Sequence, residues 1–145
     1  MNSFDILGKH VGEIDYLIES WIGKLNLSYN HFAVLYTLAN TADGQCTQKQ
    51  IGEEWYLPKQ TVFNICKEFR EKGWIEFYES TADKRERILR LTDVGKTQAE
   101  PLLQATQTMC DKAFKAFGQA KTAQLFALMG EFCQICRKEI DEFEG

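Results

Sequence analysis

Five side chains in the segment 58–72 have the types and spacing needed to bind the edges of DNA bases. An apolar row from Val62 to Phe69 recurs at helical spacing and predicts a buried helix face. The opposite face then carries Lys59, Gln60, Phe63, Asn64 and Lys67. Amide side chains can form paired hydrogen bonds with adenine, lysine can bond guanine or phosphate, and an aromatic ring can contact the thymine methyl group. We therefore expect this face to enter a DNA groove, although Phe63 would also fit packing against a neighbouring helix.

A second group of charged residues follows in a loop over residues 80–86 and in the segment after it. Its basic members are Lys84, Arg85 and Arg87. A hairpin tip that lies along a DNA backbone, or enters a narrow minor groove, needs such side chains. Asp83 stands two residues before Arg85 and can orient it through a charge-assisted hydrogen bond. By itself this loop also fits a solvated hairpin, and only its place in the chain favours a contact with nucleic acid.

The elements that position these side chains can be predicted from local signals. Thr47 and Gln50 form a capping box that begins a short helix. Pro58 disfavours helical geometry at the residue before it and suits the first turn of a new helix, which should end at Gly73. Two helices joined this closely predict a helix-turn-helix. Alternating residues over 74–79 and 87–91 predict a β-hairpin, and this order of elements is that of a winged helix.

Amphipathic helices are expected on both sides of this unit. Residues 4–25 place an apolar residue every three or four positions, and Ser28 caps a second helix over 28–40. After residue 92 we expect a helix that Pro101 kinks or splits, and a last helix over 119–143. A domain of about 65 residues offers too little surface to cover the outer helices. Packing against a second copy, as a homodimer, is the expected solution.

Composition and charge exclude several classes of protein. The net charge is −4, but residues 47–96 are close to neutral and the flanks are acidic, so the middle is the part expected to meet a polyanion. We find neither a signal peptide nor a membrane-spanning stretch, and an odd number of cysteines, five, favours reduced thiols. A cytoplasmic location without a membrane partner is expected. Phosphate-binding loops and nucleophile motifs are absent, so we expect no enzyme.

The residues that could bind a metal do not form a convincing set. His10 and His31 are isolated in the sequence. Cys133 and Cys136 have a zinc-like spacing, but a zinc site wants two further ligands. Because both cysteines fall on the apolar stripe of the last helix, we expect small buried residues there. No metal and no cofactor are predicted.

At this point the sequence resembles the MarR/SlyA family of transcriptional regulators. Residues 83–95 match the family's pattern of D-x-R, four residues, then x-L-T-x-x-G. Residues 61–75 look like the recognition helix and its exit, and residues 25–35 are similar to the entry of the second helix. The resemblance spans essentially the whole chain. Phe63 and Asn64 depart from it, since members often carry Ser or Thr followed by Arg there, and Pro58 replaces the usual polar cap.

The resemblance implies a dimer that binds a pseudo-palindromic operator with its recognition helices in successive major grooves. The DNA contacts that it implies fall on Lys59, Gln60, Thr61, Phe63, Asn64, Lys67, Asp83 and Arg85. It also implies a repressor that a small aromatic or lipophilic effector releases. Trp21, His31 and Tyr36 are the residues that we expect to line the effector site.

The expected fold is therefore mainly α with a small β-hairpin wing (α+β), a winged helix-turn-helix with N- and C-terminal dimerisation helices. The DNA-binding domain should comprise residues 28–96, and residues 1–27 and 97–145 should form the dimerisation region. The alternative function is a winged-helix adaptor that binds a partner protein and no DNA. The excess of acidic residues keeps this alternative open.

Overall fold

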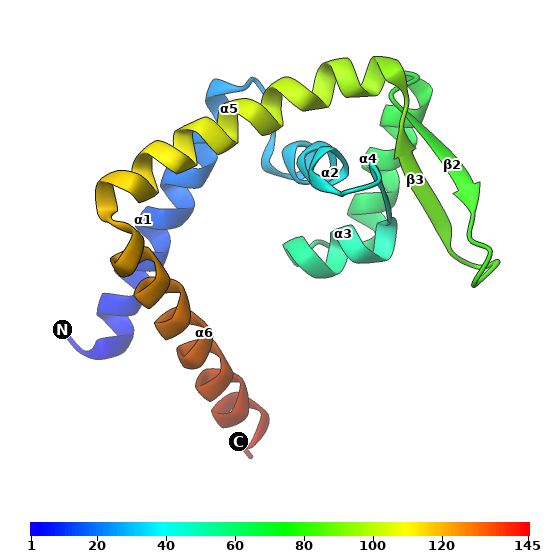
Figure 1. The fold of residues 1–145 in the computed structure, drawn as a ribbon. Helices are drawn as coiled ribbons and strands as arrows, with labels where there is room; N and C mark the ends of the chain where they lie inside the picture. Colours follow the sequence, from blue (N-terminus) through cyan, green and yellow to red (C-terminus); the bar gives the residue numbers. More distant parts are fainter. The chain divides into compact units, whose positions relative to one another are not determined.

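The computed structural model describes all 145 residues and contains six helices and one small sheet (Figure 1). The elements are α1 (Ser3–Lys24), α2 (Tyr29–Asn40), β1 (Gln45–Thr47), α3 (Gln48–Trp55), α4 (Lys59–Glu71), β2 (Ile75–Glu79), β3 (Arg87–Leu91), α5 (Asp93–Phe117) and α6 (Gln119–Asp141). The chain divides into two compact units, residues 1–104 and 105–145, and α5 crosses the boundary. The predicted fold class, a winged helix with additional terminal helices, is confirmed.

The helix ends lie where the capping signals placed them. The Ser28 hydroxyl accepts a hydrogen bond from the His31 backbone N–H at 3.2 Å and caps α2. At α3, Thr47 and Gln50 exchange backbone–side-chain hydrogen bonds of 2.8 and 3.1 Å, which is the predicted capping box. After α4, Gly73 has φ +76°, a left-handed conformation that suits glycine.

The sheet has one strand more than the sequence predicted. Its order is β1-β3-β2, and all pairs are antiparallel. β1 is only three residues long, so it carries no readable alternation, and no strand was predicted in its segment. In the hairpin, Phe77 stands opposite Leu89 and Glu79 stands opposite Arg87. Because Leu89 is buried, Phe77 and Arg87 lie on the sheet face that is turned toward the core.

Helix α5 continues through Pro101, so of the two expected outcomes, a kink or a split near Glu100, the split does not occur. A proline inside a helix removes one backbone hydrogen bond, here to the carbonyl of Thr97, and its ring crowds that carbonyl. Pro101 and Thr97 are both exposed, so water can bind the carbonyl that is left without its helical partner.

The core holds α4 by its predicted apolar row. Val62, Ile65, Cys66 and Phe69 are all buried, and they pack with side chains of α2, α3 and the sheet. The Phe69 ring stacks on Trp74 with centroids 5.1 Å apart and meets His31 edge-on. On the far side of α2, the Trp55 indole N–H donates to the Thr37 hydroxyl at 2.6 Å. Burial of this row fixes which face of α4 points outward.

The turn between α3 and α4 contains a residue in an unfavourable conformation. Tyr56 caps α3 with φ 53° and ψ 44°, and its side chain is 84% exposed. The left-handed region costs an ordinary residue about 1–2 kcal/mol, and a glycine at this position would remove that cost. The larger entropy of glycine in the unfolded chain offsets about half of this gain in stability. We expect Tyr56→Gly to raise the free energy of unfolding in urea by about 0.5–1 kcal/mol. Tyr56→Ala keeps the backbone strain and should not raise the free energy of unfolding. If the two variants had equal effects, backbone strain at residue 56 could not be the cause.

Candidate nucleic-acid interface

The outer face of α4, defined by Lys59, Gln60, Phe63, Asn64 and Lys67, is exposed along its whole length. Phe63 keeps 41% of its surface exposed, so it is not enclosed by a neighbouring helix. The Gln60 amide donates a hydrogen bond of 3.0 Å to the Asn64 side-chain oxygen. Thr61, the remaining residue predicted on this helix, is half-buried beside that face. The outer face therefore presents two linked amides between two lysines, next to an exposed ring.

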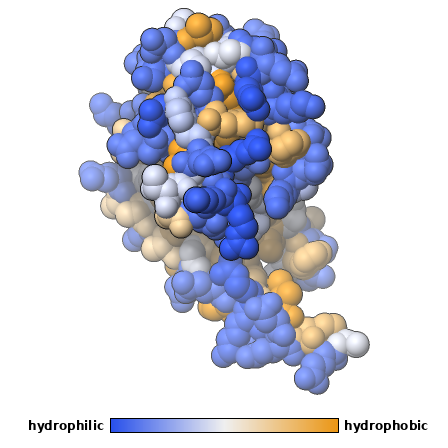
Figure 2. Space-filling model, turned by 90° about the vertical axis from the view of Figure 1, so that its right-hand side faces the viewer, coloured by the Kyte–Doolittle hydropathy of each residue, from blue (hydrophilic) through white to orange (hydrophobic).

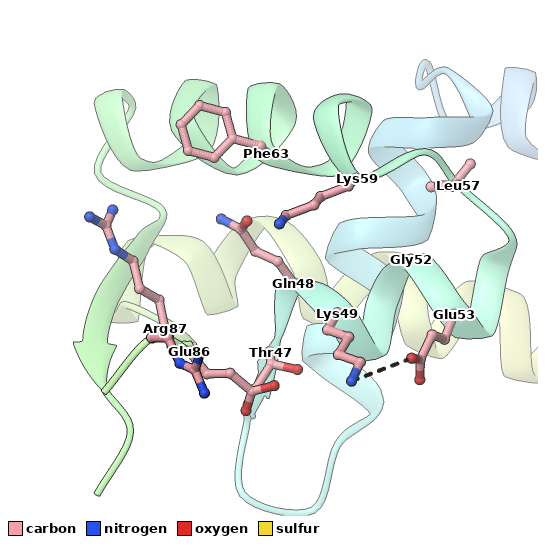
Figure 3. A pocket seen from close by; sticks show the side chains of 11 residues that line it. Thr47, Gln48, Lys49, Gly52, Glu53, Leu57, Lys59, Phe63, Glu86 and Arg87 are labelled. Carbon is pink, nitrogen blue, oxygen red and sulfur yellow. Dashed lines mark ion pairs between the residues drawn. The ribbon is translucent and has the colours of Figure 1, made fainter. Parts of the chain in front are cut away.

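A pocket of about 710 Å³ separates this face from the wing, which we define as residues 75–91. We call it the wing pocket, and it is lined by Thr47, Gln48, Lys49, Gly52, Glu53, Leu57, Lys59, Phe63, Arg85, Glu86 and Arg87. In Figure 3, Lys59 and Phe63 of α4 form one side of it, with Gln48 of α3 and Arg87 of the wing across from them. The pocket joins the consecutive helices α3 and α4 to the wing, and basic side chains outnumber acidic ones in its lining.

The wing tip has the internal contact that the sequence predicted. The Asp83 carboxylate accepts hydrogen bonds from the Arg85 backbone N–H at 3.0 Å and from its Nε at 3.5 Å. The Arg85 side chain is nonetheless 93% exposed. Its guanidinium is thus oriented but free to bind a further acceptor, and Lys84 beside it is also exposed.

Two residues at this surface, Arg70 and Phe77, were not predicted from the sequence. The Arg70 guanidinium carbon lies 5.0 Å from the centroid of the Phe77 ring, and that of Arg87 lies 5.6 Å from the same centroid. Arg70 follows Phe63 by seven positions, which is about two helical turns, so both lie on the same side of α4. Arg70 would have been predicted if the outer face had been extended to the last turn of the helix. Phe77 carried no signal for a surface role, because its alternation predicted only a strand.

The pocket that His31 lines does not include the other two candidate effector residues. His31 lines a pocket of about 320 Å³ between α2 and α4, which neither Trp21 nor Tyr36 lines. Tyr36 instead stacks on Phe32 with ring centroids 5.2 Å apart. Trp21 is half-buried near the end of α1. Their shared role as an effector site stays a prediction.

His31 connects α2 to α4 through polar contacts. Its Nε2 lies 2.8 Å from a carboxylate oxygen of Glu68, and its Nδ1 lies 2.6 Å from the Ser28 hydroxyl. A carboxylate can only accept, so Nε2 carries a proton. This hydrogen bond is the main cause that holds the pKa of the Glu68 carboxyl below its ordinary value of 4.5, and Lys72 contributes further.

This contact predicts an acid-sensitive contribution to stability. A carboxyl whose pKa is lowered by folding stabilises the protein above its ordinary pKa, and that contribution is lost as the pH falls through the lowered value. We expect Glu68→Gln to lower the urea midpoint at neutral pH and to match the parent at strongly acidic pH. Glu71→Gln, on the same helix without an ion pair, is the control. A Glu68→Gln deficit that persists unchanged in acid would contradict the prediction.

The cysteines and histidines do not assemble a metal site, since no three His, Cys, Asp or Glu side chains are grouped to hold an ion. Burial raises the pKa of the Cys46 and Cys66 thiols to about 12, which keeps them protonated and unreactive. Cys133 is exposed and Cys136 is half-buried. The expectation that both are buried is therefore wrong for the single chain.

The surface around the wing is dominated by hydrophilic side chains. Figure 2 views the molecule from the side of the wing and shows mostly hydrophilic residues there, with small separate apolar spots. None of the helices in the chain is both long and apolar enough to cross a membrane.

A helix-turn-helix with a polar outer face, followed by an arginine-tipped hairpin, defines the class of winged-helix proteins. The profile of the MarR family matches residues 25–86. A MarR family regulator from Neisseria meningitidis has 45% sequence identity over 98% of this chain and 99% of its own, with a TM-score of 0.88. The chain belongs to the MarR family, whose members are DNA-binding transcription regulators and not enzymes.

More distant structures share the fold. MepR from S. aureus, solved in complex with DNA, is 16% identical over 92% of this chain and 98% of its own, with a TM-score of 0.69. Reduced AbfR, also solved bound to DNA, is 23% identical over 94% of this chain and 93% of its own, with a TM-score of 0.67. A comparison with curated proteins gives no match.

Proposed function

We propose that this chain is a cytoplasmic repressor that binds a pseudo-palindromic operator as a homodimer and leaves it when a small effector binds. The observation that carries the proposal is the wing pocket, which places the outer face of α4 and the basic wing on two sides of one concave surface. Adjacent major and minor grooves of a duplex are separated by one sugar-phosphate strand. A helix in the major groove and a wing in the minor groove need such a space between them.

The proposed DNA contacts fall into two groups, those with base edges and those with the sugar-phosphate backbone. Gln60, Phe63 and Asn64 read base edges in the major groove, since their side chains are exposed and carry the groups that bind adenine and the thymine methyl. Lys59, Thr61 and Lys67 bind phosphate or guanine at the borders of that site. On the wing, Arg85 enters the minor groove with Asp83 holding it, and Lys84 and Arg87 bind the backbone. Residues 28–96 form the DNA-binding domain in this proposal.

Dimerisation is supported by the apolar side chains that the single chain leaves exposed. On α1 these include Leu7, Val11, Ile14 and Ile18, and on α6 they include Phe126, Met129 and Ile140. Exposed apolar surface of this extent marks an interaction site, and the stripe along each helix fits helix-on-helix packing. Residues 1–27 and 97–145 therefore bind the same regions of a second copy, which brings two DNA-binding domains to one operator.

Effector release is proposed with Trp21, His31 and Tyr36 as lining residues for a small aromatic or lipophilic molecule. Their aromatic rings and the imidazole suit such a ligand. His31 contacts Glu68 on α4, so a ligand that displaces this contact acts directly on the helix that reads DNA.

Enrichment of random duplexes on the purified protein tests the proposal. We expect a palindromic consensus, a dimer by light scattering, and affinity that falls as salt rises, by about 0.9 log unit per log unit of salt for each phosphate contact. An adaptor that binds only protein would give no consensus and no duplex binding. A monomer that binds a single half-site would contradict the dimer.

A further inference from the structure

At the junction of α4 and the wing, two arginines from different elements converge on one aromatic ring. Arg70 lies in the last turn of α4, and Arg87 begins β3. Their guanidinium carbons are 5.0 and 5.6 Å from the centroid of Phe77 on β2. Guanidinium groups at such distances are attracted to the face of the ring. Phe77 therefore gathers two positive charges that would otherwise repel each other.

Neither arginine has an acidic partner. No carboxylate lies within 4.0 Å of either guanidinium, although Glu79 stands directly opposite Arg87 in the strand register. Neither side chain forms a hydrogen bond within the protein, and both are exposed. Two guanidinium groups that share a ring and lack a carboxylate leave their donors available, and these donors match the oxygens of a phosphate.

We propose that Arg70, Phe77 and Arg87 form a phosphate clamp for the DNA strand that runs between the major and minor grooves. Arg70 and Arg87 donate to phosphodiester oxygens, and Phe77 is a positioning residue that holds both guanidinium groups. Arg87 also lines the wing pocket, which places the clamp at the end of the space proposed for the strand. The proposal rests on the proposed DNA binding and adds Arg70 and Phe77 to its contacts.

The chain supplies a matched control on the opposite face of the same hairpin. Arg90 lies over the Tyr78 ring at 5.0 Å and donates a hydrogen bond to Gln45 at 2.7 Å. Since Arg90 is three residues after Arg87, it lies on the sheet face turned away from α4. It has the same charge and the same kind of ring contact, but it faces away from the wing pocket and already has a hydrogen-bond acceptor.

The test measures duplex binding by fluorescence anisotropy over a series of KCl concentrations, with the enriched operator and with a random duplex. The slope of log affinity against log salt concentration should become less steep by about 0.9 per bound subunit in Arg70→Gln and in Arg87→Gln. The change should be the same for both duplexes. Arg90→Gln should keep the parent slope. A parent slope in Arg70→Gln, or an equal change in Arg90→Gln, overturns the clamp.

Phe77 is tested separately, because its role is to position other residues. Phe77→Leu keeps both charges and should weaken binding about two- to fivefold for each subunit bound, whereas Phe77→Tyr keeps a ring and should match the parent. In an Arg70→Gln/Arg87→Gln background, Phe77→Leu should cause no further loss. The same loss in both backgrounds would show that Phe77 acts only on the fold. If the parent binds no duplex, the proposed function fails; if it binds and the slopes are unchanged, only the clamp fails.

Discussion

Gly95→Ala is expected to destabilise the protein by about 3 kcal/mol or more, the upper range for overpacking a closed site. A Cβ atom built on Gly95 would overlap the carbonyl oxygen of Trp74 and lie 2.8 Å from its carbonyl carbon. These are backbone atoms, and they are held on both sides. The Trp74 carbonyl accepts from the Thr92 N–H, and the Trp74 N–H donates to the Phe69 carbonyl, both at 2.9 Å. The start of α5 would have to separate from the base of the wing.

Urea unfolding followed by circular dichroism measures this effect, with Gly23→Ala as the control. Nothing lies within 4 Å of a Cβ built on Gly23, which is in the last turn of α1. Because alanine favours helix over glycine, that variant should gain up to about 1 kcal/mol. A Gly95→Ala midpoint equal to that of the parent would mean that the approach of α5 to Trp74 is not tight.

Asn64→Ala and Arg85→Ala are expected to impair DNA binding in different ways. Asn64 lies in the middle of the outer face of α4, so its loss should reduce the preference for the enriched operator by about 1–3 kcal/mol and leave binding to random duplexes nearly unchanged. Arg85 is at the wing tip, where the proposed contact is in the minor groove and not with base edges of the major groove, so its loss should weaken binding to all duplexes alike. Anisotropy titrations with both duplexes at fixed salt distinguish the two patterns.

Thermal unfolding of both variants provides the control, since both side chains are exposed and neither change should alter the fold. If both variants bind the operator like the parent, the assignment of these contacts is wrong. If Asn64→Ala weakens both duplexes equally, the residue binds the backbone and does not read sequence.

Local signals predicted the elements of the DNA-binding unit well. The capping box of Thr47 and Gln50, Gly73 and the apolar row of α4 each act within a few residues, so they can be recognised in the sequence without knowledge of the fold. β1 could not be recognised, because its three residues form a strand only through pairing with β3, more than forty positions away. At Pro101 the sequence allowed a kink or a split, and the structure rules out only the split, because α5 continues through the proline.

The candidate site was predictable where one element supplies it and not where several do. The outer face of α4 followed from helical spacing, and the Asp83–Arg85 contact followed from their separation by two residues. The convergence of Arg70 and Arg87 on Phe77 depends on how the last turn of α4 meets the sheet, which no local pattern encodes. The same holds for His31, whose link to Glu68 spans thirty-seven positions.

The hydrogen bond between Gln60 and Asn64 restricts two side chains that would otherwise rotate independently. The Gln60 amide N–H donates to the Asn64 Oδ1 at 3.0 Å, and it leaves the Asn64 amide N–H groups and a second lone pair of that oxygen available. Under the proposed contacts, Asn64 would therefore lose less side-chain entropy when it bonds an adenine. Gln60 would then affect recognition at the base that Asn64 bonds as well as at its own.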